Sequence, residues 1–213
     1  MGKLRVWGIN SGRAIRVYWA LEELGLDYEV RPIGARTGET KTAGYRVVNP
    51  REKIPALEDG DFRLRESMAI VTYLGDTYGD GGVGLVPNEP LARARYDEWC
   101  FFIAMELDAT SLYVLRRHKY LAEIYGEAPT AVAGAEAYFL RMAGTVEAAL
   151  ADGRRHLVDD AFSGADIHLV CCLDWARRYE IDLPPNLTAY RDRLAARPAY
   201  ARAETVCYPD GVK

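Results

Sequence analysis

The first part of the chain alternates between strand-like and helix-like patterns of apolar residues. Apolar positions alternate with polar ones in the strand-like stretches, and they recur every three or four residues in the helix-like ones. Asp59-Gly60-Asp61 between two short apolar stretches predicts a hairpin. The predicted elements, in order, are a strand at 3–8, a helix at 14–24, a strand at 28–33, hairpin strands at 54–59 and 62–65, and a helix at 67–78. This order, with a loose segment before the hairpin, is typical of the thioredoxin-like fold.

Helical patterns dominate after a stretch from 80 to 90 that is rich in Gly and Pro and has no periodicity. The predicted helices cover about 91–119, 129–151, 164–179 and 186–196. We therefore predict an α/β plus all-α protein. It consists of a thioredoxin-like domain at residues 1–80, a linker at 81–90 and an all-helical domain at 91–213.

One helix of the second domain has a recognisable beginning. Ser163 can cap the amide of Asp166 while the Asp166 carboxylate accepts from the Ser163 amide, and Phe162 with Ile167 can form a hydrophobic staple. We expect this capping box to stabilise the fold and to take no part in chemistry.

Composition excludes several classes of function. The 213 residues, 49% of them hydrophobic, suffice for a full core, and no apolar run approaches the roughly 20 residues of a membrane span. The N-terminus lacks the apolar region of a signal peptide, so we expect a cytoplasmic protein without a membrane partner. Basic and acidic residues balance through residue 80, and the net charge of −4 lies in the remainder. Neither part indicates a nucleic-acid partner.

Cysteines and histidines do not indicate a metal or redox site. Their spacing matches neither metal ligands nor a Cys-x-x-Cys pair, so we expect buried thiols and no metal. The residues concerned are Cys100, Cys171, Cys172, Cys207, His118, His156 and His168.

The segment around Ile54-Pro55 has the features of a receptor for a small anionic peptide. Pro55 opens the apolar run that ends at Leu57, and an X-Pro bond tolerates the cis form, which would turn the peptide group of Ile54 outward. Ile54 could then pair with the main chain of a bound peptide. Ser67 begins the next helix, where unpaired amides favour a carboxylate. The alternative is an ordinary hairpin followed by a serine helix cap.

The run Asn49-Pro50-Arg51-Glu52-Lys53-Ile54-Pro55-Ala56-Leu57, followed by Glu66-Ser67, resembles the glutathione transferase family, whose pattern is NPxGKVPxL and then an E-S pair. The resemblance extends over essentially the whole chain, although Glu52 stands where the family usually has Gly. It implies a homodimer that uses glutathione as co-substrate. The roles it implies are a position near the glycyl end for Lys53, main-chain pairing with the cysteinyl residue for Ile54 beside Pro55, and binding of the γ-glutamyl end for Glu66 and Ser67. Lys41 could contact the glycyl carboxylate or be a solvated lysine.

Glutathione chemistry requires a thiolate, and a free thiol with a pKa near 8.5 is mostly protonated at neutral pH. The family keeps a Tyr, Ser or Cys against the sulfur in the loop after the first strand. The stretch from Asn10 to Val17 resembles the N-S-x-N-V-x-K-V stretch of some bacterial members, which makes Ser11 the candidate. The alternative for Ser11 is a plain helix cap, with Asn10 as the reserve donor. Arg13 replaces the second Asn of that stretch and either contacts the ligand or lies on a solvated face.

The resemblance implies transfer of the glutathione thiolate to small, mostly apolar electrophiles, a detoxification chemistry. The first 99 residues contain no cysteine, which disfavours mixed-disulfide exchange in this domain. The second substrate would contact one face of the first helix of the second domain, although such a stripe can also be core. Its candidate residues are Phe102, Met105, Glu106 and Tyr113. The alternatives are glutathione-dependent peroxide reduction or isomerisation on the same site, and a non-catalytic binding module.

Overall fold

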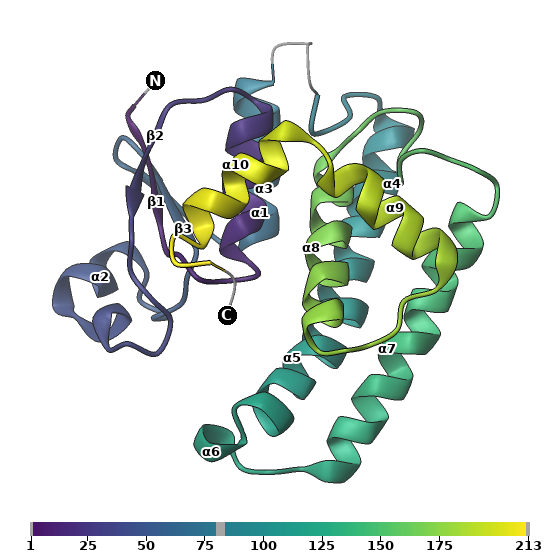
Figure 1. Ribbon diagram of the computed structural model, residues 1–213. Helices are drawn as coiled ribbons and strands as arrows, with labels where there is room; N and C mark the ends of the chain where they lie inside the picture. Colours follow the sequence, from purple (N-terminus) through teal and green to yellow (C-terminus); the bar gives the residue numbers. More distant parts are fainter. Residues whose placement is uncertain (1, 80–83, 212–213) are drawn as a thin grey trace. The chain divides into compact units, whose positions relative to one another are not determined.

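The computed structural model describes residues 2–79 and 84–211. They divide into two compact units, the first drawn from Met1–Val86 with Ala195–Lys213 and the second formed by Pro87–Leu194. Figure 1 shows the chain coloured from its N-terminus to its C-terminus. The predicted linker begins in the part of the chain that is not described.

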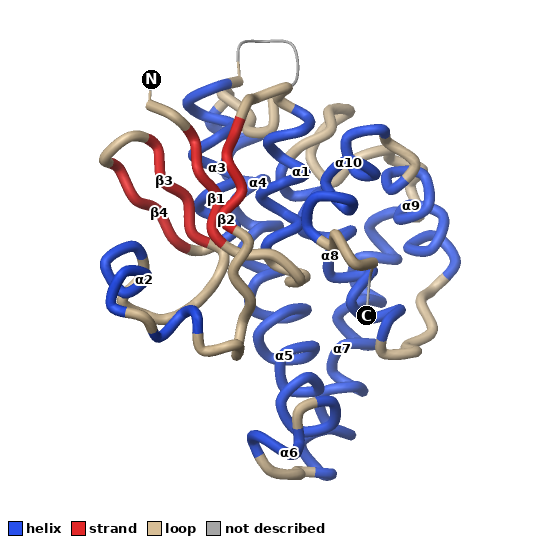
Figure 2. The backbone as a smooth tube through the Cα atoms, turned by 60° about the vertical axis from the view of Figure 1, so that its left-hand side comes forward, coloured by secondary structure: helices blue, strands red, loops and turns tan. Residues whose placement is uncertain are grey.

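The first unit contains a four-stranded mixed sheet in the order β2-β1-β3-β4 (Figure 2). Its strands are β1 at Leu4–Trp7, β2 at Tyr28–Arg31, β3 at Ala56–Asp59 and β4 at Phe62–Arg65. β2 pairs parallel with β1, whereas the pairs β1/β3 and β3/β4 are antiparallel. The order of elements confirms the predicted thioredoxin-like fold. The strands were predictable because alternating polarity is a local signal for a half-buried strand.

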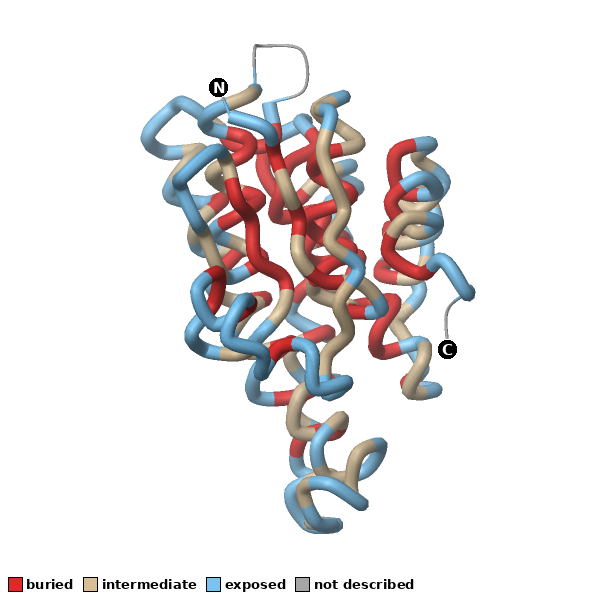
Figure 3. Tube along the Cα trace, turned by 90° about the vertical axis from the view of Figure 1, so that its left-hand side faces the viewer, coloured by how far each residue is buried: buried red, intermediate tan, exposed pale blue. Residues whose placement is uncertain are grey.

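Two helices cover this sheet through their apolar positions. Helix α1 spans Ala14–Glu23 and packs on α3 at Ser67–Tyr78. Every residue from 14 to 21 is buried, as are the apolar positions of α3 that recur at helical spacing (Figure 3). Burial of each large apolar side chain contributes about 1.5–3 kcal/mol, which is the main stabilisation of this layer.

The segment expected to be loose contains a short helix. A 3-10 turn, η1, covers Glu39–Lys41, and α2 covers Ala43–Val48. The Thr42 hydroxyl caps α2 by accepting from the Tyr45 amide at 3.2 Å. Six residues are too few for a helical period to stand out, and a helix of this length depends on its cap and its tertiary contacts.

Helix α10, at Pro198–Cys207, belongs to the first unit and packs against α1 (Figure 1). Arg197 forms a two-pronged ion pair with Glu23 at 2.6 and 2.7 Å, and the rings of Trp19 and Tyr200 meet edge to face at 4.8 Å. The division of the chain therefore differs from the predicted helical domain at 91–213. The prediction followed the helical periodicity, which does not reveal which partner a helix packs on.

Among the residues that the structure describes, all regular secondary structure of the second unit is helical. The predicted helix at 91–119 is a continuous run whose middle has π-helical hydrogen bonding. Helix α8 is buried along nearly its whole length, and α7 packs along the π-helical run. The elements are α4 (Pro90–Phe102), η2 (Ile103–Leu112), α5 (Tyr113–Leu115), η3 (Arg116–Tyr120), α6 (Ala122–Tyr125), α7 (Pro129–Leu150), α8 (Gly164–Arg178) and α9 (Pro185–Ala195). No helix among the described residues is both long and apolar enough to cross a membrane.

The predicted capping box is present at the start of α8. The Ser163 amide donates to the Asp166 carboxylate at 2.6 Å, and the Ser163 hydroxyl lies 3.0 Å from the same oxygen. Phe162 and Ile167 are both buried. The four cysteines are buried thiols that form no disulfide, as predicted.

Candidate functional site

The peptide bond between Ile54 and Pro55 is cis. The carbonyl of the preceding Lys53 is held from two sides, by the Tyr45 hydroxyl at 2.5 Å and by the side-chain amide of Asn49 at 2.7 Å. Burial raises the pKa of Tyr45 to about 12, so its hydroxyl is protonated and donates. The N–H and C=O of Ile54 make no hydrogen bond with any residue that the structure describes. They form an open main-chain edge, which is what addition of an extended peptide requires.

The preceding turn accommodates Glu52 where the family pattern has Gly. Glu52 has a φ of 56°, in the left-handed region that glycine adopts readily, and its carboxylate accepts from Arg46 Nε at 2.7 Å. The substitution therefore keeps a glycine-like backbone conformation at a cost in strain.

Ser67 begins α3 and is buried next to a buried arginine. Arg16 of α1 donates from Nη1 to Ser67 Oγ at 3.3 Å, and its side chain is 2% exposed. Glu66, directly before the helix, has a φ of 70° and an exposed carboxylate paired with Arg51 at 2.6 Å. A guanidinium, a hydroxyl and the first amides of a 12-residue helix thus meet, and this combination favours a carboxylate ligand.

Sequence reasoning missed Arg16. The available signal was a single charged residue among the apolar residues from 14 to 21, all of which the structure buries. Its meaning depends on the position of Ser67, which is 51 residues away in the sequence.

Ser11 occupies the loop between β1 and α1 and is 9% exposed. Its hydroxyl oxygen accepts from the amides of Arg13 and Ala14 at 3.3 and 3.4 Å, and its carbonyl accepts from Ala14 and Ile15 at 3.0 and 3.2 Å. These bonds match the alternative role of a helix cap. They use the oxygen as an acceptor and leave the hydroxyl hydrogen to donate, so capping is compatible with a hydrogen bond to a sulfur anion.

The loop that carries Ser11 is fixed from several directions. The buried Tyr18 hydroxyl donates to the Gly8 carbonyl at 2.9 Å, and burial raises the pKa of Tyr18, which keeps that hydroxyl protonated. The Asn10 amide donates to the Cys207 carbonyl of α10 at 2.8 Å, and Asn10 itself is exposed with a φ of 53°. The C-terminal helix therefore positions the loop, which the sequence did not indicate.

Close packing places this loop against Ile54. A Cβ added to Gly8 would lie 2.5 Å from Ile54 Cβ, closer than real Cβ atoms approach. The Ser11 loop, the open edge of Ile54 and the Ser67–Arg16 pair are thus joined through direct contacts of α1 and its preceding loop.

The remaining predicted residues have less specific surroundings. Lys41 and Lys53 are exposed, and Arg13 is half-buried. In the second unit Glu106 accepts from the Tyr138 hydroxyl, and this hydrogen bond raises the pKa of Tyr138. Three further residues of that unit differ in exposure: Met105 is 56% exposed, whereas Phe102 and Tyr113 are half-buried. Among the described residues, no group of three or more His, Cys, Asp or Glu side chains could hold a metal ion.

Known proteins resemble this chain along most of its length. Residues 2–76 match the model of the glutathione S-transferase N-terminal domain, and residues 102–198 match that of the C-terminal domain. Glutathione S-transferase 3 of Zea mays is 31% identical over 95% of this chain and 93% of its own. A probable maleylacetoacetate isomerase 1 of Drosophila melanogaster is 30% identical over 87% of this chain and 72% of its own.

One solved structure has the same fold as this chain, and its sequence identity to this chain is similar to that of the two relatives. It is the theta class glutathione S-transferase of Xanthomonas axonopodis pv. citri with glutathione bound. It has a TM-score of 0.79 and 29% identity, and the match covers 95% of this chain and 97% of that one.

Proposed function

Because the chain belongs to the glutathione transferase family, we propose that it transfers the thiolate of glutathione to small electrophilic, mostly apolar substrates. The observation that carries this proposal is the arrangement around α1. The Ser11 hydroxyl lies at the N-terminus of α1, and the open main-chain edge of Ile54 lies beside the loop before this helix. The buried Arg16 of α1 donates to Ser67 at the start of α3.

Each part of glutathione has a chemically suitable partner in the first unit. The γ-glutamyl carboxylate would bind at Ser67 and Arg16, and the carboxylate of Glu66, which also pairs with Arg51, would meet the amino group. The cysteinyl main chain would pair with the N–H and C=O of Ile54 beside Pro55. The glycyl carboxylate would meet Lys53, with Lys41 as a second cation. Binding along the main chain fixes where the sulfur lies.

Ser11 would donate its hydroxyl hydrogen to the sulfur, with Asn10 as reserve and Arg13 as a nearby cation. Each unit of pKa lowering corresponds to about 1.4 kcal/mol. One hydrogen bond to an anion and the N-terminus of α1 together supply about 1.5–3 kcal/mol, which is one to two units. A thiol near pKa 8.5 would then titrate close to neutral pH. The thiolate attacks an electrophilic carbon, a sulfur–carbon bond forms, and the displaced group leaves with its electron pair.

The second unit would contact the electrophile through Phe102, Met105, Glu106 and Tyr113, and the protein would act as a homodimer. Sedimentation tests the homodimer, since a monomer at micromolar concentration would contradict it.

Single alanine replacements of the four residues test their contact with the electrophile. They should raise KM for the electrophile and leave KM for glutathione unchanged.

Isomerisation is a second candidate function, supported by the 30% identity to the probable maleylacetoacetate isomerase. The same thiolate would add to a conjugated double bond, allow rotation about the resulting single bond, and leave again. Glutathione is then recovered unchanged. Product analysis separates the two reactions, because conjugation consumes thiol in proportion to product and isomerisation does not.

The replacement Ser11→Ala tests the proposed role of the hydroxyl. We expect kcat at least tenfold lower, affinity for glutathione within several-fold of the wild type, and a pH–rate profile displaced toward higher pH. Ser163→Ala is the matched control, because it also removes a serine helix cap and has no predicted contact with the sulfur. It should leave kcat unchanged. A Ser11→Ala protein with unchanged kcat and pH profile would exclude Ser11 from this role.

A further inference from the structure

The hydroxyl of Tyr18 is a buried side-chain donor to the loop that carries Ser11. Tyr18 lies in the second turn of α1, its side chain is fully buried, and its hydroxyl donates to the Gly8 carbonyl at 2.9 Å. Side chains of a helix lean toward its N-terminus, so a tyrosine at this position reaches back to the loop that precedes the helix. The hydrogen bond therefore closes residues 8–18 into a ring that contains Ser11.

Several other contacts of this loop are made by main-chain groups. The amides of Gly8, Ile9 and Asn10 each donate to a carbonyl at 2.8–3.0 Å. The carbonyls belong to Arg31, Ile33 and Cys207. The Gly8 carbonyl differs, because its donor is a side chain. A replacement of Tyr18 can therefore release one point of the loop while these main-chain hydrogen bonds remain.

Gly8 connects the Ser11 loop with the main-chain edge of Ile54. It has a φ of 115° and packs so closely on Ile54 that an added Cβ would lie 2.5 Å from Ile54 Cβ. The hydrogen bond from Tyr18 thus holds the loop against the residue that is proposed to pair with the cysteinyl main chain of glutathione. The distance from the Ser11 hydroxyl to the sulfur depends on this packing, and a hydrogen bond weakens steeply when its geometry is displaced.

We propose that Tyr18 is a positioning residue, whose hydroxyl holds the Gly8 carbonyl and thereby sets the distance from the Ser11 hydroxyl to the glutathione sulfur. The inference rests on the proposed role of Ser11 and adds a residue that touches neither substrate. Without this hydrogen bond the Ser11 loop would shift, the hydrogen bond to the thiolate would weaken, and the thiol pKa would rise. The contacts of glutathione with Ile54 and Ser67 would remain, so affinity should change little.

The replacement Tyr18→Phe tests this inference, because it removes the hydroxyl and keeps the buried ring. The ultraviolet absorbance of the thiolate of bound glutathione, followed against pH, measures the thiol pKa. We expect this pKa to rise by about 0.5–1 unit, and kcat below the pKa to fall about three- to tenfold with the thiolate fraction. The Kd for glutathione, measured by calorimetry, should stay within about threefold of the wild type. Burial raises the pKa of Tyr18 itself, so its own hydroxyl does not titrate in this range.

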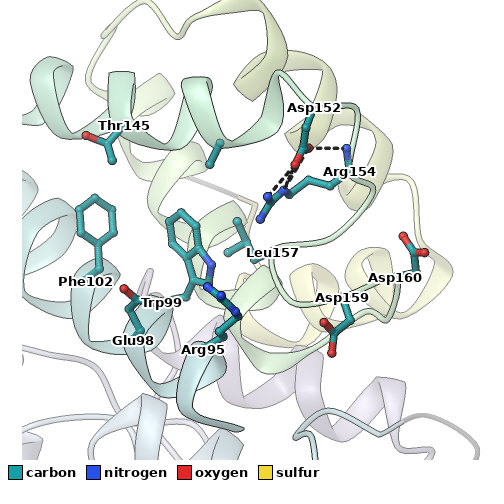
Figure 4. Close-up of a pocket in the computed structure, with 11 residues that line it drawn as sticks. Arg95, Glu98, Trp99, Phe102, Thr145, Asp152, Arg154, Leu157, Asp159 and Asp160 are labelled. Carbon is teal, nitrogen blue, oxygen red and sulfur yellow. Dashed lines mark hydrogen bonds and ion pairs between the residues drawn. The ribbon is translucent and has the colours of Figure 1, made fainter. Parts of the chain in front are cut away.

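Tyr190→Phe in the second unit is the matched control, because it also removes the hydroxyl of a buried tyrosine. Figure 4 shows Leu157, whose amide donates to the same Asp166 carboxylate as the Tyr190 hydroxyl. The control should lower the midpoint of urea unfolding and leave kcat and the thiol pKa unchanged. Equal decreases of kcat in Tyr18→Phe and Tyr190→Phe would overturn the inference, because a general loss of stability would then explain both.

The double variant Ser11→Ala/Tyr18→Phe separates this inference from the Ser11 proposal. If Tyr18 acts through Ser11, adding Tyr18→Phe to Ser11→Ala should lower kcat by less than about twofold. An equal fold decrease in both backgrounds would overturn the inference. If kcat falls in Ser11→Ala and both kcat and the thiol pKa are unchanged in Tyr18→Phe, the inference fails and the Ser11 proposal stands. Unchanged kcat in Ser11→Ala would overturn both.

Discussion

Replacing Asp166 by alanine removes one carboxylate that holds three segments of the second unit together. Its side chain is fully buried and accepts from the Leu157 amide at 2.9 Å, from the Ser163 amide at 2.6 Å, and from the hydroxyls of Ser163 and Tyr190. These donors come from the segment before α8, from its cap and from α9. Asp166 is thus a junction as well as one half of a capping box.

The loss of folding stability in Asp166→Ala follows from the hydrogen-bond donors that the replacement leaves without an acceptor. The amides of Leu157 and Ser163 and the hydroxyl of Tyr190 would lose their acceptor, at about 1–3 kcal/mol for each buried group. Burial raises the pKa of Asp166, which shows that the carboxylate is itself costly to bury and reduces the net loss. We expect a loss of about 3–5 kcal/mol, a large share of the roughly 5–15 kcal/mol that stabilises a typical domain.

Urea unfolding followed by circular dichroism measures this loss, with Ser163→Ala as the graded control. Ser163→Ala removes the cap and leaves the carboxylate with its other donors, so it should cost about 1 kcal/mol. The midpoint for Asp166→Ala should therefore fall well below that for Ser163→Ala. Equal midpoints for the two variants would refute the assignment of Asp166 as a junction.

Two further replacements test the first unit. Gly8→Ala should cost about 3 kcal/mol and weaken glutathione binding at least tenfold, because Gly8 has a φ of 115° and the new Cβ would collide with Ile54. Gly12→Ala in the same loop has nothing within 4 Å of the added Cβ and should be nearly neutral, so equal effects in calorimetry would contradict the packing described. The pKa of Glu58 is lowered: burial opposes the shift, but hydrogen bonds from Trp7 and Arg63 outweigh it. A lowered pKa in the folded state gives stability that is complete above the unfolded pKa and is lost as pH falls through the folded one. Urea midpoints between about pH 6 and pH 3 should therefore fall less for Glu58→Gln than for the wild type, and parallel curves would contradict this sign.

The fold was predictable where the signal is local. Strand alternation and helical spacing located β1, α1, β2, β3, β4 and α3, because each element buries one face at its own period. Helix α2 was not predicted, because its six residues depend on the Thr42 cap. The packing of α10 on α1 was not predicted for a different reason. The contact of Arg197 with Glu23 spans 174 positions, and no periodicity within either helix encodes it.

The candidate site likewise contains residues that local motifs predict and residues whose role depends on tertiary packing. Ser11, Ile54 and Ser67 stand out from the sequence because family motifs and turn chemistry mark their positions. Arg16 does not, because its function follows from a hydrogen bond to Ser67 that exists only after α1 and α3 have packed. The support that Cys207 gives to the Ser11 loop likewise depends on where the C-terminal helix packs.

A crystal structure of the protein with glutathione is the most direct test of the central claim. We predict the sulfur within hydrogen-bond distance of Ser11 Oγ, the cysteinyl main chain paired with the N–H and C=O of Ile54, and the γ-glutamyl carboxylate on Ser67 and Arg16. A tripeptide bound elsewhere, or a sulfur nearest to a residue other than Ser11, would contradict the account.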